Sequence, residues 1–337
     1  MRRVATVSLL LLLAVAARAQ RTEIVWPTPN PAWQQGRGIE AFVQPTVSGD
    51  PTSGLFGCVR SNGAQFHEGV DLKALARDSR GEPTDPIFAA MDGVVRYVNS
   101  HPGESNYGRY VVLEHPDSAP AVYTLYAHLS RIEPGLAPGG RVVRGQVIAT
   151  MGRSSSGAAI PRERAHVHFE IGLMVTENFS AWYRLRGFGS PNEHGLWNGM
   201  NLMGIDPLDF LRAWRSKRVD NFQQYFDQMK AVVRVRIATN SVPDFIRRYP
   251  ALLRRPLPAG FVGGWEIECN STGLPFAWTP LTPAQVTGLR LHSPQIVSVD
   301  SAVVRAYRCK SLVKPRGAGY VPGSDLAEML QQIFGAR

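Results

Sequence analysis

The sequence predicts a mainly β fold, with an antiparallel β-sheet domain followed by a smaller C-terminal module of helices and strands. From Phe88 onward, short β-type runs follow one another closely and are bounded by Gly, Pro and Asn: residues 93–98, 109–114, 121–128, 146–151 and 166–173. Strands spaced this closely predict an antiparallel, all-β core. Apolar and polar residues also alternate, since Tyr110 and Val112 share one face of their strand while Val111 and Leu113 share the other.

The first 19 residues have the three-part layout of a secretory signal. Arg2 and Arg3 precede an apolar run, and small residues follow up to Ala19. The apolar run is shorter than the roughly 20 residues that span a bilayer, and no later segment is long enough either. We therefore expect cleavage after Ala19, export to the periplasm or the medium, and no membrane span in the mature chain.

The remaining residues divide into three parts. Residues 20–51, rich in Pro, Gly, Thr and Gln, predict an extended lead-in with little regular structure. Residues 52–214 form the β-sheet domain, in which 174–205 is a long insertion. Asp206 and Pro207 fit the N-cap and first position of a helix near its end. Residues 215–337 form the C-terminal module, with helices expected at 221–229 and 244–253 and strand-like runs at 260–269 and 296–309.

The positive charge is concentrated in the C-terminal part. The formal net charge is +10, but residues 20–211 hold 16 Lys/Arg against 19 Asp/Glu, whereas residues 212–337 hold 18 against 8. This asymmetry fits attraction to an anionic envelope polymer, and it fits equally a solvated surface without a particular partner. Nucleic acid is not an expected partner, because an exported chain without a recognition motif gives no reason for one.

Three cysteines in an exported chain predict one disulfide and one free thiol. Cys269 and Cys309 lie in the same C-terminal region, so we expect these two to pair and Cys58 to be free and buried. The sequence alone leaves other pairings open.

Three short segments carry histidines in patterns that suit metal chemistry: residues 66–71, 126–130 and 166–170. His166 and His168 lie two apart on a predicted strand and would point into one cleft. A catalytic zinc commonly takes three His or Asp/Glu ligands and keeps a position for water, which His67, Asp71 and His168 can provide. His166 would then serve as the base, and His128 would stabilise the oxyanion. Taken singly, each segment also fits ordinary structural histidines.

Together the segments resemble the lysostaphin/LytM-type zinc metallopeptidases of bacterial cell-wall metabolism. The pattern is His-x-Gly-x-Asp at residues 67–71, Tyr-x-His-Leu at 126–129 and His-x-His-Phe-Glu at 166–170, within a resemblance that covers about residues 52–212. The resemblance implies an antiparallel sheet whose groove holds one zinc ion on His67, Asp71 and His168, with His128 and His166 as catalytic partners.

The resemblance also implies a function, the hydrolysis of peptide stems or crosslinks of peptidoglycan by a zinc-dependent endopeptidase. We expect Arg60, Tyr126 and Glu170 to support the metal ligands or contact the substrate. A different class of function is a non-enzymatic envelope adaptor that activates a cell-wall amidase. Adaptors of this fold typically lack one or more ligands, whereas all five histidine and aspartate positions are filled here.

Overall fold

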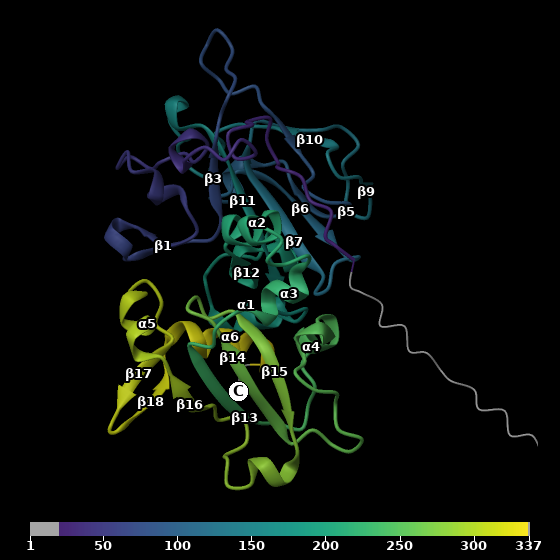
Figure 1. The fold of residues 1–337 in the computed structure, drawn as a ribbon, viewed down its shortest axis with the longest axis vertical. Helices are drawn as coiled ribbons and strands as arrows, with labels where there is room; N and C mark the ends of the chain where they lie inside the picture. Colours follow the sequence, from purple (N-terminus) through teal and green to yellow (C-terminus); the bar gives the residue numbers. More distant parts are fainter. Residues whose placement is uncertain (1–19, 336–337) are drawn as a thin grey trace, which may run out of the picture.

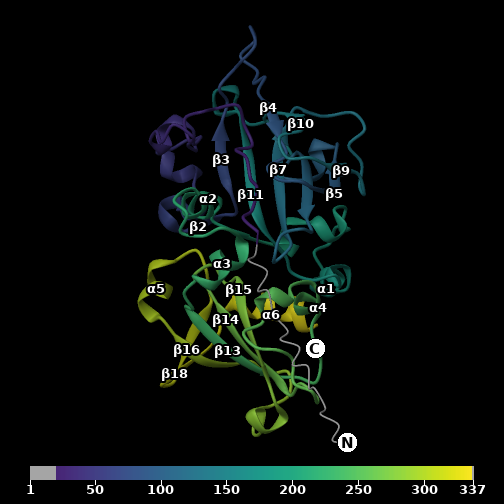
Figure 2. The ribbon, with the colours of Figure 1, turned by 45° about the vertical axis from the view of Figure 1, so that its right-hand side comes forward.

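Two parts stacked along the longest axis make up the molecule, as Figures 1 and 2 show. The computed structural model describes residues 20–335, so the predicted signal at residues 1–19 lies outside the described part. The strands of the N-terminal domain are β1 (Gly57–Arg60), β2 (Gln65–His67), β3 (Val70–Lys73), β4 (Pro86–Phe88), β5 (Gly93–Asn99), β6 (Arg109–His115), β7 (Val122–Leu129), β8 (Arg131–Ile132), β9 (Arg141–Val142), β10 (Val147–Thr150), β11 (His166–Met174) and β12 (Leu202–Ile205).

The centre of this domain is a seven-stranded sheet in the order β12-β11-β7-β6-β5-β9, with β3 also paired to β11. A three-stranded sheet, β4-β10-β8, and the hairpin β1-β2 complete the domain. Every pairing between these strands is antiparallel, which confirms the predicted fold class. The five runs predicted from alternation correspond to β5, β6, β7, β10 and β11.

The two faces of the seven-stranded sheet bury different sets of side chains. Val111, Leu113 and Phe169 belong to the large core. Tyr110 and Val112, on the other face, belong to a smaller cluster that also holds Tyr123, Leu125 and Ala127. The predicted alternation is therefore correct, and it places the smaller cluster on the face from which His168 also projects.

The lead-in packs tightly although it has little regular structure. Trp26 and Trp33 are buried and stacked, with ring centroids 5.1 Å apart. Gln44 donates its backbone N–H to the carbonyl of Asp71 at 2.8 Å, and Lys73 donates to Phe42 at 3.0 Å. The lead-in thus extends the edge of β3 and fixes the strand that carries Asp71.

The insertion and the end of the domain contain two helices, α1 (Phe179–Arg186) and α2 (Pro207–Arg215). Asp206 caps α2 as expected, because its carboxylate accepts hydrogen bonds from the N–H groups of Leu208 and Asp209. The helix α1 and the strand β12 lie within the segment 174–205, where the sequence indicated only an irregular insertion.

The second part is a four-stranded antiparallel sheet, β15-β14-β13-β16, with helices and a hairpin around it. Its elements are α3 (Phe222–Asp227), β13 (Val233–Ala238), α4 (Asp244–Arg248), β14 (Gly264–Cys269), β15 (Pro275–Leu281), β16 (Gln295–Val299), α5 (Ser301–Ala306), β17 (Val313–Arg316), β18 (Gly319–Pro322) and α6 (Ser324–Phe334). Residues 296–309 are therefore not one strand, because Asp300 caps α5 through the N–H groups of Ala302 and Val303.

The two parts share one core, which fixes how they sit on each other. A continuous cluster of buried apolar side chains runs from Trp26 through Phe169 and Phe210 to Trp265 and Trp278. In both views α6 lies at the junction between the two parts. None of the helices in residues 20–335 is long and apolar enough to cross a lipid bilayer.

The predicted cysteine pairing is wrong. Cys58 on β1 forms a disulfide with Cys309, with 5.6 Å between the two Cα atoms, and Cys269 is free and buried. The error came from pairing cysteines by nearness in the sequence, because the fold brings together positions separated by 251 residues. Cys269 instead lies at the end of the core strand β14, fully shielded from solvent.

Candidate metal centre

Backbone pairing brings the three predicted metal ligands to one place. Asp71 and His168 face each other in the register of β3 and β11, and His67 ends β2, just before β3. Gly69 lies between His67 and Asp71, where a Cβ atom would come 2.4 Å from the carbonyl oxygen of Phe169. Only a glycine allows the chain to pass this close to β11, which explains the glycine in the His-x-Gly-x-Asp motif.

The ligand atoms of these residues form a small triangle. His67 Nε2 lies 2.9 Å from His168 Nδ1 and 3.1 Å from Asp71 Oδ1, and His168 Nδ1 lies 3.0 Å from the same oxygen. Tetrahedral ligands at the usual zinc distance of about 2.0–2.1 Å are themselves about 3.3 Å apart. The triangle therefore has nearly the size that three zinc ligands require, and all three side chains are buried.

Hydrogen bonds on the far side of each ring determine which nitrogen carries the proton. His67 Nδ1 donates to the carbonyl of Leu55 at 2.7 Å, so its Nε2 is left with a lone pair. His168 Nε2 donates to Glu170 Oε1 at 2.9 Å, so its Nδ1 is left with a lone pair. Two lone pairs and one carboxylate oxygen thus converge, which is an arrangement of acceptors that a cation satisfies.

Arg60 orients the carboxylate of Asp71, one of the three predicted metal ligands. Its Nη2 donates to Asp71 Oδ2 at 2.6 Å, and its Nε donates to the carbonyl of Ser53. Burial acts to raise the pKa of Asp71, but the neighbouring His67, His166 and His168 outweigh it and hold this pKa well below its usual range. The carboxylate is therefore ionised, as a metal ligand must be.

Glu170 supports His168 from within a network of buried hydroxyl groups. Tyr107 donates to Glu170 Oε1 at 2.6 Å, and Tyr123 donates to Oε2 at 2.8 Å. Burial acts to lower the pKa of His168, but the carboxylates of Asp71 and Glu170 raise it to about 10. This position therefore stabilises a positive charge, which a proton or a metal ion can supply. Neither tyrosine was predicted, because no short motif connects them to the histidines.

His128 reaches the site because the strand that carries it has a bulge. Arg109 pairs with Leu129 while Val111 pairs with Tyr126, so β7 holds one more residue than β6 over this stretch. His128 has a φ of +63°, in the left-handed region. Regular alternation would point His128 to the same side as Tyr126, and the bulge turns it toward His168 instead.

His128 and His166 lie side by side, with ring centroids 4.8 Å apart. His128 Nδ1 donates to the carbonyl of Ser154 at 2.9 Å, and His166 Nδ1 donates to that of Arg164 at 2.7 Å. Each ring therefore presents Nε2 as a lone pair, and His166 Nε2 lies 3.4 Å from Asp71 Oδ1. Burial, followed by the neighbouring imidazoles of His166 and His168, lowers the pKa of His128 well below its usual range.

Tyr126 does not take part in this cluster, although the sequence suggested it as a supporting or substrate-contacting residue. Its ring is fully buried in the large core, where it packs against Phe169. Its hydroxyl accepts a hydrogen bond from the backbone N–H of Ala90 at 2.8 Å. Tyr126 therefore supports the sheet from the face opposite His168.

The cluster opens into a cavity of about 810 Å³. His67, His128 and His168 line it, together with Arg60 and Tyr107. Residues of the C-terminal module also line this cavity, and we call them the module wall: Thr272, Gly273, Lys310, Ser324, Asp325, Glu328, Met329 and Gln332. This wall could not be predicted from local sequence patterns, because its residues come from three separate segments of the chain.

The N-terminal domain is an antiparallel β-sheet domain that carries a buried His/Asp/His cluster. Residues 65–178 match the model described as peptidase family M23. This match confirms the resemblance found in the histidine motifs. The comparison with curated proteins found no match.

Solved structures with detectable similarity include several proteins of this kind. One is a mutant catalytic domain of the prophage-encoded M23 protein EnpA from Enterococcus faecalis, 26% identical, with 39% of this chain and 79% of that chain covered and a TM-score of 0.28. Another is a putative glycyl-glycine endopeptidase LytM from Ruminococcus gnavus, with 22% identity, 44% and 47% coverage and a TM-score of 0.30. A third is the catalytic domain of the antimicrobial peptidase lysostaphin from Staphylococcus simulans, with 19% identity, 47% and 87% coverage and a TM-score of 0.28.

Proposed function

We propose that this chain is a zinc-dependent endopeptidase that hydrolyses peptide bonds in bacterial peptidoglycan. The observation that carries the proposal is the convergence of His67 Nε2, His168 Nδ1 and Asp71 Oδ1, with two further imidazoles beside them. Each ligand nitrogen is freed for a metal by a hydrogen bond on the other side of its ring. The family match supports a peptidase.

Zinc bound by these three residues supplies Lewis acidity, which lowers the pKa of water toward neutrality and polarises a carbonyl group. The chain provides the remaining chemistry. His166 Nε2 carries a lone pair beside the ligands and is placed to accept the proton of the attacking water. Arg60 and Glu170 hold Asp71 and His168 in position.

The role of His128 depends on which of its two ring nitrogens carries the proton. Because Nδ1–H is bonded to Ser154, the neutral ring faces the site with an acceptor. His128 becomes a hydrogen-bond donor to the oxyanion only after its Nε2 takes up a proton. We therefore assign it a proton-carrying role that precedes oxyanion stabilisation.

Digestion of purified peptidoglycan, followed by mass spectrometry of the muropeptides, tests the proposal. The wild-type chain should release fragments whose masses correspond to cut peptide stems or crosslinks. The variant His166→Ala should release almost none, while His101→Ala, which changes a mostly exposed histidine elsewhere, should behave as the wild type.

The same experiment separates the enzyme from an envelope adaptor. An adaptor would leave every peptide stem intact when it acts alone, even with zinc present, and would increase cleavage only when an amidase is added. Binding of an anionic envelope polymer by the C-terminal module stays a prediction from charge. A salt series with purified cell wall would test it, because binding of this kind weakens as salt increases.

A further inference from the structure

The C-terminal module and the candidate metal centre share one cavity. The module wall lines it together with His67, His128 and His168, and the cavity is large enough to receive several residues of a peptide. A substrate that reaches the metal ligands therefore also meets the module.

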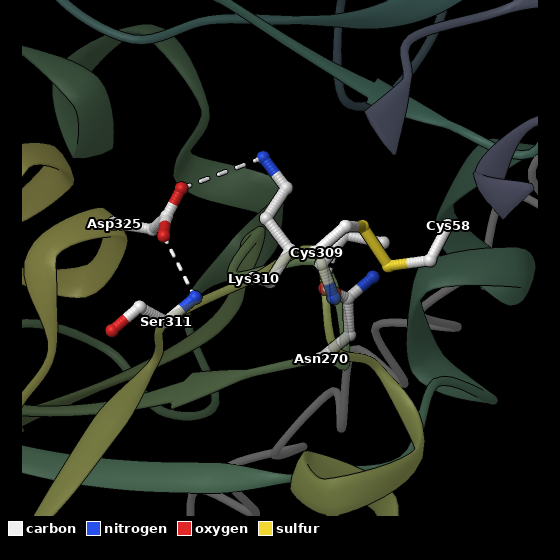
Figure 3. Close-up of a disulfide and its surroundings, with 7 residues drawn as sticks. Cys58, Asn270, Cys309, Lys310, Ser311 and Asp325 are labelled. Atoms are coloured by element: carbon white, nitrogen blue, oxygen red, sulfur yellow. Dashed lines mark hydrogen bonds and ion pairs between the residues drawn. A yellow bond between two sulfur atoms is a disulfide. The ribbon is translucent and has the colours of Figure 1, made fainter. Parts of the chain in front are cut away.

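A disulfide holds the module wall against the metal-binding domain. Cys58 lies on β1, and its backbone partner in the hairpin is Phe66, which precedes His67. The bond from Cys58 to Cys309 thus ties the module to the hairpin that positions a metal ligand, as Figure 3 shows. A second link between the two parts is a hydrogen bond, which Gln332 Nε2 donates to the carbonyl of Met200 at 3.0 Å.

Lys310 follows Cys309 directly and places its ammonium group at the cavity. Its Nζ lies 4.0 Å from the centre of the Phe66 ring. It also forms an ion pair with Asp325 Oδ1 at 3.8 Å, which is longer than a hydrogen bond and is drawn as a dashed line in Figure 3. The side chain is one-fifth exposed. Asp325 is itself occupied, because its Oδ2 accepts the backbone N–H of Ser311 at 2.7 Å.

The other charged groups around the cavity have different surroundings. Arg60 is committed to Asp71 and to the carbonyl of Ser53. Glu68 and Glu104 are exposed, so water screens their charges. Glu328 forms an ion pair with Arg186 at 3.5 Å. Of Arg60 and Lys310, the described lysine and arginine that line the cavity, Lys310 is thus the one whose charged group makes an ion pair but no hydrogen bond within the protein.

We propose that the module wall forms a substrate subsite in which Lys310 binds a carboxylate of the peptide. The inference rests on the proposed function for the identity of the substrate as a stem peptide. A partly buried ammonium that makes only a long ion pair with Asp325 can still donate hydrogen bonds to a carboxylate, and the disulfide next to it fixes its position. The C-terminal module would therefore select among peptides by their charge.

Equilibrium binding to the full-length oxidised chain tests the subsite without requiring turnover. The probes are a synthetic stem tetrapeptide with free carboxylates and the same peptide with these groups amidated. The wild type should bind the free acid about tenfold more tightly than the amide, and Lys310→Gln should reduce this ratio to about one. Lys314→Gln, which changes an exposed lysine on β17 of the same module, should keep the wild-type ratio.

Equal binding of the two peptides by the wild type, binding of neither, or an unchanged ratio in Lys310→Gln would overturn the subsite. The double variant Cys58→Ser/Cys309→Ser should also lose most of the preference, with its fold checked by circular dichroism. A folded double variant that keeps the full affinity ratio would show that the disulfide is not needed to position Lys310. A wild type that shows the preference but cuts no peptidoglycan would contradict the proposed function and leave the subsite intact.

Discussion

His168 donates its Nε2–H to Glu170 Oε1 at 2.9 Å, and this bond leaves Nδ1 as the nitrogen that faces Asp71. Changing Glu170 to Gln keeps the shape of the side chain but removes the charge that holds the ring in this tautomer. We expect zinc affinity to fall about 10- to 100-fold, as for other outer partners of metal ligands. Competition with a chromogenic chelator measures this affinity.

The matched control for that change is Glu114→Gln. Glu114 is also on the seven-stranded sheet, but it pairs with Arg96 away from the metal ligands. The zinc affinity of the Glu114→Gln variant should equal that of the wild type. Equal affinities for Glu170→Gln and the wild type would show that Glu170 does not set the tautomer of His168.

Changing His128 to Ala should separate catalysis from metal binding. The ring lies beside His166 but is not part of the ligand triangle, so zinc content should stay the same. We expect kcat to fall about 100- to 1,000-fold, the usual loss when one oxyanion-stabilising group is removed. Metal analysis and hydrolysis of one defined muropeptide would be measured on the same preparation. Loss of zinc in this variant would contradict the assignment.

His115 should make the stability of the fold depend on pH. Burial lowers its pKa to about 4, while Nδ1 donates to the carbonyl of Asp92 and Nε2 accepts from Thr124. The imidazole of His115 is protonated below about pH 6.5 in the unfolded chain but only below about pH 4 in the folded chain. The free energy of unfolding therefore falls as the pH drops from 6.5 to 4, by about 3 kcal/mol from this group.

Denaturant unfolding of the wild type and His115→Gln across this range checks the prediction. The difference between the two free energies of unfolding should shrink as the pH falls, because only the wild type has this histidine to protonate. His101→Gln, at an exposed position, should follow the wild type. A difference that stays constant from pH 7 to pH 4 would be inconsistent with a neutral, buried His115.

The disulfide should be found between Cys58 and Cys309 in the oxidised protein. Peptide mapping without reduction should show these two cysteines linked and Cys269 unmodified by alkylating reagents until the chain unfolds, because burial raises the pKa of the Cys269 thiol and shields it. Replacing Cys58 and Cys309 by Ser should lower the free energy of unfolding by about 2–5 kcal/mol. A peptide that links Cys269 to Cys309 would contradict the fold at this point.

Local patterns were enough to predict most of the sheet. Alternation and turn residues identified five strands nearly to their ends, and the pair Asp206 and Pro207 identified the start of α2. These features depend on neighbours in the sequence, which is why reading along the chain finds them. The His motifs similarly identified the three residues that the fold brings together in the ligand triangle.

Features that depend on distant residues could not be predicted in this way. The bulge that turns His128 is set by pairing with β6, and the disulfide joins positions 251 residues apart. Tyr107, in the turn before β6, and Tyr123, on β7, meet Glu170 only because β6, β7 and β11 lie side by side. Tyr126 was assigned to the site by its nearness to His128 in the sequence, but strand geometry places it on the opposite face.

Zinc analysis of the folded full-length chain and its ligand variants tests the central claim most directly. The account predicts about one zinc per chain in the wild type, and almost none in His67→Ala, Asp71→Ala or His168→Ala, with peptidoglycan cleavage lost in the same three variants. A folded wild type that cuts peptidoglycan without any transition metal, or a His168→Ala variant that keeps its full zinc content, would contradict it.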